Sequence, residues 1–254
     1  MTPYVHPQSV VRKIWGKSDT ILFIFAGAAA EFALNKAVDW LYFTGRIPKD
    51  PIGRLFSTVE YARHIVFASK EEAEATVDKI TAIHDGVEKA RGARIPDWAY
   101  RDVLFMLIHY SIAAFELLER RLTNAEKEDL YTVFLGIGQR MNVPDLPETY
   151  NAWLPVREAH LQNNLARSAY TNDLFKQYKR QLGFLRYRVL REAQVLVVPK
   201  RVSTLLRFKK FSLLYLAVPL YKWSRLVNAD AAIKWLLLPP AYKKQIQALD
   251  VVPS

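Results

Sequence analysis

Two histidines and an arginine–threonine pair lie in segments that are otherwise apolar or helix-forming. Arg54 and Thr58, in "DPIGRLFSTVEY", are four residues apart, so on a helix their side chains share one face. His84 lies on the apolar stripe of "SKEEAEATVDKITAIHDGVEKA", and His109 lies in the middle of "LFMLIHYSIAAF". Burying an imidazole is unfavourable unless both ring nitrogens find partners. These four residues are therefore the first candidates for a functional site.

The residue types allow two interpretations. In the structural one, His84 and His109 are core histidines bonded to backbone carbonyls, Arg54 pairs with an acidic neighbour, and Thr58 bonds a carbonyl of its own helix. In the chemical one, a neutral imidazole on an apolar helix wall is an axial ligand for haem iron or another metal. The spacing alone leaves both open.

Several other chemistries have no support. The chain has no cysteine, which removes disulfides, thiolate zinc sites and cysteine nucleophiles. No His-x3-His or Glu-x-x-His pair occurs, and no Gly-x-Ser-x-Gly elbow. The "GIGQR" segment at 136–140 lacks the strand that a phosphate-binding loop needs. Hydrolysis by a nucleophile and non-haem metal chemistry are therefore disfavoured.

The elements that must position these residues are predicted to be helices. Glycine is scarce, and the apolar residues recur every three or four positions. Capping boxes are expected at Ser69 with Glu72 and at Thr123 with Glu126. The pattern predicts helices at 8–18, 19–43, 54–67, 69–90, 98–121, 124–141, 157–182, 184–196 and 202–227, a loop at 44–53, and a proline-stopped turn at the end. The fold class is all-α.

No membrane-spanning helix is expected. The best candidate, residues 20–43, contains Glu31, Lys36 and Asp39, each of which costs roughly 2.5–3.5 kcal/mol at the centre of a bilayer. The run at 211–223 is shorter than the ~20 residues that a bilayer requires. The start of the chain lacks a signal peptide pattern. The expected location is the cytoplasm, with a membrane-peripheral alternative.

The charge is concentrated in the C-terminal part. Residues 1–150 hold 18 Lys and Arg against 20 Asp and Glu, a net −2, whereas residues 151–254 hold 18 against 5, a net +13. We therefore divide the chain into a helical core at 1–160 and a basic helical part at 161–254 packed on the same domain. Aromatic residues among these cations favour an anionic lipid surface as partner. Nucleic acid is not expected, because no nucleic-acid-binding motif accompanies the charge.

Four segments in order are similar to one known family: "DPIGRLFSTVEYARHIVF", "ITAIHDGVEKARG", "LIHYSIAAFELLERRLTNAEKEDLYTVFLGIGQRMNVPDLPETYNAW" and, more weakly, "WLLLPPAYKKQ". They resemble the catalytic domain of the rubber oxygenases (latex-clearing protein) and the mpaB-type oxygenases, a family with many uncharacterised bacterial members. The resemblance covers about residues 10–160.

The resemblance implies a globin-like helical core around haem b, with His84 as the proximal ligand of the iron and Arg54 and Thr58 beside the haem. It places His109 in the pocket wall. Lys89, or alternatively Arg91, takes the place of an arginine that relatives carry after the histidine motif. O₂ and an apolar, alkene or lipid-like substrate are the implied reactants.

The chain also departs from the family pattern. Leu34-Asn35-Lys36 stands where many relatives have Ala-His-Pro, and "WAYRDV" lacks a proline that relatives carry. Three functions are consequently considered: a haem b oxygenase, a haem protein without catalysis, and a basic helical module that binds membrane surfaces. The oligomeric state is not predicted.

Overall fold

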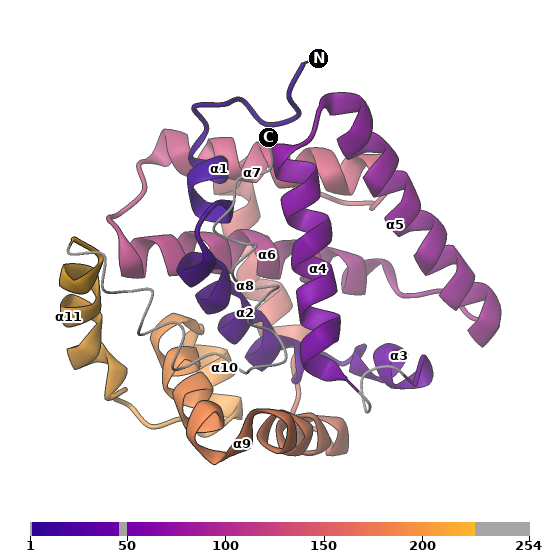
Figure 1. The fold of residues 1–254 in the computed structure, drawn as a ribbon. Helices are drawn as coiled ribbons and strands as arrows, with labels where there is room; N and C mark the ends of the chain where they lie inside the picture. The colour runs from indigo at the N-terminus through magenta and orange to yellow at the C-terminus, as the bar shows by residue number, and fades with distance from the viewer. Residues whose placement is uncertain (1, 46–49, 227–254) are drawn as a thin grey trace.

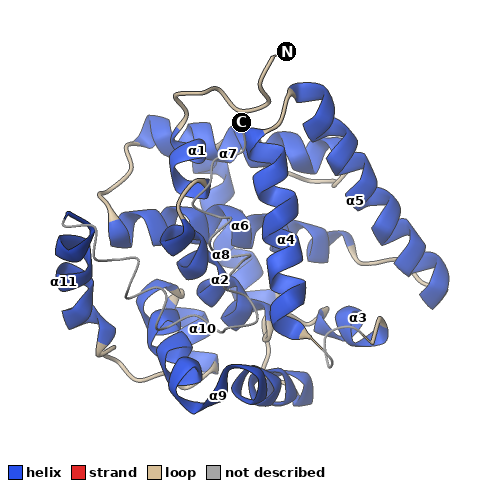
Figure 2. Ribbon diagram, viewed as in Figure 1, coloured by secondary structure: helices blue, strands red, loops and turns tan. Residues whose placement is uncertain are grey.

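A computed structural model describes residues 2–45 and 50–226, and these residues form a compact, all-helical domain (Figures 1 and 2). This confirms the predicted fold class. The backbone between the helices makes only two isolated β-bridges within the described residues. The helices are α1 (Val10–Trp15), α2 (Ser18–Phe32), α3 (Val38–Phe43), α4 (Pro51–Phe67), α5 (Lys70–Arg91), α6 (Asp97–Leu118), α7 (Asn124–Arg140), α8 (Tyr150–Asn163), α9 (Ala169–Val197), α10 (Lys200–Leu205) and α11 (Leu214–Leu226).

The centre of the domain is the contact between α2 and α6. The predicted central helix is indeed buried over most of its length, with Phe105, Ile108 and Tyr110 fully enclosed. Gly27 on α2 permits the close approach, because a Cβ there would lie 2.2 Å from Cδ1 of the Tyr110 ring. A glycine at this position is therefore required by packing rather than by backbone conformation.

Helix starts follow the local sequence. Both capping boxes are present as predicted, at Ser69 and at Thr123. At α4, the Asp50 side chain accepts a hydrogen bond from the backbone N–H of Gly53 at 2.8 Å, and Pro51 occupies the first helical position. A Cβ at Gly53 would lie 2.0 Å from Asp50 Oδ2, so the cap depends on this glycine.

The prediction of one continuous helix at 19–43 was wrong. The helix ends at Phe32, and α3 begins only at Val38. Between them, the Asn35 side chain accepts a bond from the backbone N–H of Ala37, and the backbone N–H of Lys36 donates to the Asn164 carbonyl. Residues 164–166, which follow α8, therefore pair with backbone groups that a continuous helix would have paired.

The predicted helix at 157–182 was also wrong, because α8 starts at Tyr150 and ends at Asn163. Ser168 then caps α9, which kinks at Gly183, where φ is +73°. This kink divides α9 close to the predicted boundary between 182 and 184. The proposed division at residue 160 falls inside α8, and it stays a prediction.

The predicted helix at 202–227 consists of two helices, α10 and α11, joined by a segment that includes the buried Ser212. The predicted closing turn lies outside the described residues. Within residues 2–45 and 50–226, no helix combines the length and the apolar character that crossing a membrane requires.

Candidate functional site

One face of α5 carries the principal candidate residue. Ala73 and Val77 on this face are buried, whereas the next residues along it, Ile80, His84 and Val87, are only half-buried. In Figure 1, the C-terminal end of α5, the start of α4 and α3 lie on the same side of the molecule. The apolar face is therefore covered in its first half and partly open in its second half, where the histidine lies.

His84 lies between α4 and α6. Its ring meets the ring of Tyr100 edge-on, with the centroids 5.2 Å apart. Burial and, secondarily, the nearby guanidinium of Arg54 lower the pKa of His84 below its usual value. The imidazole is therefore neutral near pH 7, which is the form that binds a metal ion.

One ring nitrogen of His84 lacks a partner. Nδ1 is buried and makes no hydrogen bond within the part of the chain that the structure describes. The structural interpretation required a core histidine with both nitrogens satisfied, and the observed ring does not meet that requirement. His84 is therefore not the fully bonded core histidine of the structural interpretation.

Arg54 and Thr58 contact each other at the start of α4. The Arg54 guanidinium donates to Thr58 Oγ1 and to Ser57 Oγ, both at 3.2 Å. Thr58 Oγ1 in turn donates to the Arg54 carbonyl at 3.2 Å, as the structural interpretation predicted. The two hydroxyls therefore hold the guanidinium on the side of α4 where its charge lowers the pKa of His84.

A second set of contacts fixes the chain around the histidine. Glu88, one turn after His84, accepts bonds from the Tyr100 hydroxyl at 3.1 Å and from the Ile95 backbone N–H at 2.8 Å. Burial and the carboxylate of Glu88 raise the pKa of Tyr100, so its hydroxyl stays protonated. These bonds fasten the start of α6 to α5 and hold the Tyr100 ring against His84.

The basic residues that follow His84 differ in position. Lys89 is exposed, and its side chain projects from a different face of α5 than His84 does. Arg91 is half-buried, donates to Asp39 at 2.7 Å and lies over the Trp40 ring at 4.0 Å. Both stay candidates for the arginine of the family pattern, and Arg91 is the one that points toward α3.

The structure does not bring His109 to His84. His109 lies nine residues after Tyr100 on α6, about 13 Å along the helix and on its opposite side. Its imidazole bonds the backbone of Val197, and its ring meets the Tyr110 ring edge-on. Burial, followed by the charge of Arg157, lowers the pKa of His109 to about 3. Its role in a pocket wall stays a prediction.

The sequence analysis missed a buried polar cluster in the core. Arg157 on α8 donates two hydrogen bonds to Glu31 on α2, both at 2.6 Å, and the Tyr110 hydroxyl donates to Glu31 Oε2 at 2.7 Å. Burial and the charge of Glu31 raise the pKa of Tyr110. The signal was present, since Glu31 interrupts an apolar helix, but its partner lies 126 residues away.

A second buried cluster surrounds Asp102 on α6. Its carboxylate accepts bonds from the side chains of Asn35 at 2.7 Å and Asn164 at 3.1 Å, and it contacts Nδ1 of His160. These residues join the end of α2 to α6 and α8. Asn35 is therefore part of the structural framework of this chain.

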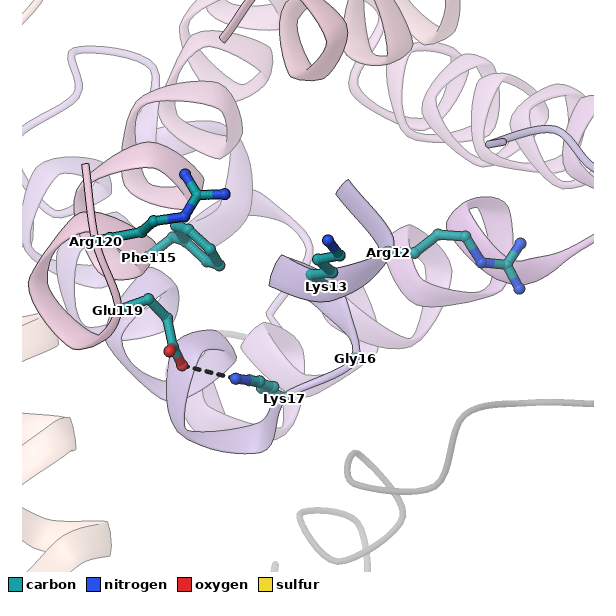
Figure 3. A pocket seen from close by; sticks show the side chains of 7 residues that line it. All are labelled: Arg12, Lys13, Gly16, Lys17, Phe115, Glu119 and Arg120. Atoms are coloured by element: carbon teal, nitrogen blue, oxygen red, sulfur yellow. Dashed lines mark hydrogen bonds and ion pairs between the residues drawn. The ribbon is translucent and has the colours of Figure 1, made fainter. Parts of the chain in front are cut away.

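A basic depression of about 530 Å³ lies between α1 and the end of α6 (Figure 3). Lys13, Lys17 and Arg120 supply its cations, and Lys17 pairs with Glu119 at 2.7 Å. Arg12 also lines it, but its guanidinium points away, over the Phe67 ring. None of its lining residues belongs to the surroundings of His84.

Among the described residues, no three His, Asp or Glu side chains are grouped as ligands for a metal ion. A haem iron does not need such a group, because the porphyrin supplies four ligands and the protein can supply one histidine. The arrangement at His84 is compatible with that requirement.

Residues 13–229 match the family model described as ER-bound oxygenase mpaB/B'/rubber oxygenase, catalytic domain. The chain belongs to this family. The match covers most of the chain and extends well past residue 160, where the resemblance seen in the sequence weakened. In the same comparisons, no curated protein and no solved structure matches the chain. The family is an oxygenase catalytic domain, so the chain is oxygenase-like and is expected to combine a small molecule with O₂.

Proposed function

We propose that the chain is a haem b-dependent oxygenase in which His84 is the protein ligand of the iron. The observation that carries this proposal is the buried, unpartnered Nδ1 of a neutral imidazole on the half-open face of α5. Because Nδ1 is enclosed by the protein, Nε2 is the ring nitrogen that would bind the iron in this proposal.

Arg54 and Thr58 support the cofactor in this proposal. Arg54 carries a positive charge close enough to His84 to lower its pKa, and Thr58 fixes the guanidinium through its hydroxyl. A haem propionate is a carboxylate, and an arginine binds carboxylates through charge-assisted hydrogen bonds. Arg54 would therefore hold a propionate while His84 stays neutral. Lys89, which is exposed, and His109, on the other side of α6, have weaker geometric support.

The remaining residues would shape the pocket. Bound haem b supplies a centre at which O₂ is bound and activated for oxidation. Ile80 and Val87 flank His84 on its own face, and Phe43 at the end of α3 is 48% exposed. These side chains present apolar surface on the side of the molecule where the cofactor is proposed to bind. They favour an apolar substrate, such as an alkene or a lipid-like molecule.

The test is oxygen consumption by the haem-loaded protein. Purified protein is reconstituted with haemin, separated from free haemin, and supplied with a long-chain alkene and O₂ while an oxygen electrode and mass spectrometry record uptake and products. We expect consumption of O₂ coupled to an oxygenated product, and its loss in Arg54→Ala when the bound haem is lost.

A haem protein without catalysis is the alternative that this assay distinguishes. Stable haem binding through His84 with no product from any apolar substrate would favour it. Failure to bind haem at all would contradict both functions.

A further inference from the structure

The contacts of helix α11 with the rest of the domain include three side-chain hydrogen bonds. The Tyr221 hydroxyl donates to Asp19 Oδ2 at 3.1 Å, and Lys222 Nζ donates to the Glu119 carbonyl at 2.9 Å. At its start, the Ser212 hydroxyl donates to the Glu192 carbonyl at 3.0 Å. In Figure 1, α11 stands at the edge of the molecule. These contacts fix which face of α11 points inward.

The opposite face of α11 is apolar and exposed. Four large apolar residues follow one another at steps of three, four and three positions, which places them on one side of the helix. They are Leu213, immediately before α11, and Leu216, Leu220 and Trp223 within it. Their exposed fractions are 65%, 66%, 70% and 65%. We call these four residues the α11 stripe. The inward side also carries half-buried apolar residues, Leu214, Ala217 and Val218, so α11 is apolar on both sides and only one side is covered.

The sequence around the α11 stripe is cationic, although the Glu192 carboxylate accepts a bond from the backbone N–H of Leu213 at 2.7 Å. From Lys200 to Leu226 the chain contains seven Lys and Arg residues and no Asp or Glu. Arg207, Lys209 and Lys210 in the segment before α11 are exposed. A partner for this face must therefore have both an apolar region that the side chains can enter and a negative charge.

We propose that the α11 stripe lies in the surface of an anionic lipid bilayer. Its leucines and tryptophan would enter the boundary between head groups and acyl chains, and Lys209 and Lys210 would contact the lipid phosphates. The stripe is an exposed ridge on a helix at the edge of the domain, which suits a flat, deformable lipid surface better than it suits a peptide that needs a groove. Two copies of this face would bring like charges together, which disfavours self-association.

Vesicle co-sedimentation of the full chain tests this proposal. The probes are vesicles of phosphatidylcholine alone and vesicles that also contain phosphatidylserine. We expect binding to the anionic vesicles only. Leu220→Glu should lower the partition coefficient at least about tenfold, because the variant no longer transfers the apolar surface of Leu220 from water into the lipid. Replacing Lys209 and Lys210 with glutamine should lower it roughly tenfold to thirtyfold.

Leu154→Glu is the matched control, because Leu154 is also an exposed leucine but lies on α8. We expect it to bind vesicles as the natural chain does. The proposal is overturned if the natural chain ignores anionic vesicles, or if Leu220→Glu binds as well as Leu154→Glu. It is also overturned if gel filtration shows a dimer that Leu220→Glu dissociates, since the stripe would then be an interface between copies. None of these outcomes depends on haem.

Discussion

Replacing Arg157 with methionine should destabilise the protein strongly. The Arg157 and Glu31 side chains are only 5% and 1% exposed, and two hydrogen bonds of 2.6 Å join them. Methionine fills a similar volume but leaves the Glu31 carboxylate buried without its cation. Removing one partner of a buried ion pair costs about 3–5 kcal/mol.

This cost translates into a measurable change in melting temperature. The entropy of unfolding is about 2.1 cal/mol/K per residue, so a chain of 254 residues loses about 2 °C for each kcal/mol. We therefore expect Arg157→Met to lower Tm by about 6–10 °C. Thermal unfolding followed by circular dichroism gives this value, and urea unfolding gives the free energy independently.

Arg140 provides the matched control. It makes the same two-point contact with a carboxylate, to Asp78 at 2.7 and 2.8 Å, but both side chains are exposed. Solvent screens such a pair, so Arg140→Met should shift Tm far less than Arg157→Met. The two substitutions are chemically identical, and the Arg140 site differs in its exposure and in a further contact with Glu74 at 3.2 Å.

A triple variant separates the lost pair from lost packing. Combining Arg157→Met with Glu31→Leu and Tyr110→Phe removes all three polar groups together, so no charge or hydroxyl stays buried without a partner. We expect this variant to recover at least half of the lost stability. If Arg157→Met unfolds within 2 °C of the natural chain, or if the triple variant is less stable than Arg157→Met, the reasoning about this cluster is refuted.

Two further predictions concern α2 and α6. Gly27→Ala should lower the free energy of unfolding by about 1–3 kcal/mol, since its Cβ would lie 2.2 Å from the Tyr110 ring. Gly86 on α5 has open space around it, so Gly86→Ala should raise the free energy of unfolding by about 0.5–1 kcal/mol. Urea unfolding of both variants compares them. The pKa of His109 is about 3 in the folded state and about 6.5 when unfolded, so the unfolded chain takes up a proton first as pH falls. From pH 6.5 down to 3, the natural chain should therefore lose up to ~1.4 kcal/mol per pH unit relative to His109→Asn, and a constant difference across this range would contradict the assigned burial.

Local signals predicted the fold well where they act over short distances. The capping boxes at Ser69 and Thr123 and the continuous apolar pattern of α6 depend on neighbouring residues, and the structure confirms them. The end of α2 and the break before α9 depend on contacts between residues 34–36 and 164–166. No local pattern contains that information, which explains why both helices were predicted too long.

At the candidate site too, the sequence predicted relations within one helix but not contacts between helices. The spacing of Arg54 and Thr58 correctly placed them on one helical face, and the resemblance drew attention to His84. The sequence could not show that Tyr100 lies against His84, or that Arg91 reaches Trp40 on α3. Those relations are set by the angle between α5 and α6 and by the position of α3.

Titration of the purified protein with haemin tests the central claim most directly. The account predicts a Soret band that saturates at one haem per chain. His84→Ala should lose this spectrum and regain it when imidazole is added, while His64→Ala, which removes an exposed histidine of α4, should leave it unchanged. A natural chain that gives no Soret band with haemin, or a His84→Ala spectrum identical to that of the natural chain, would contradict the assignment of His84 as the iron ligand.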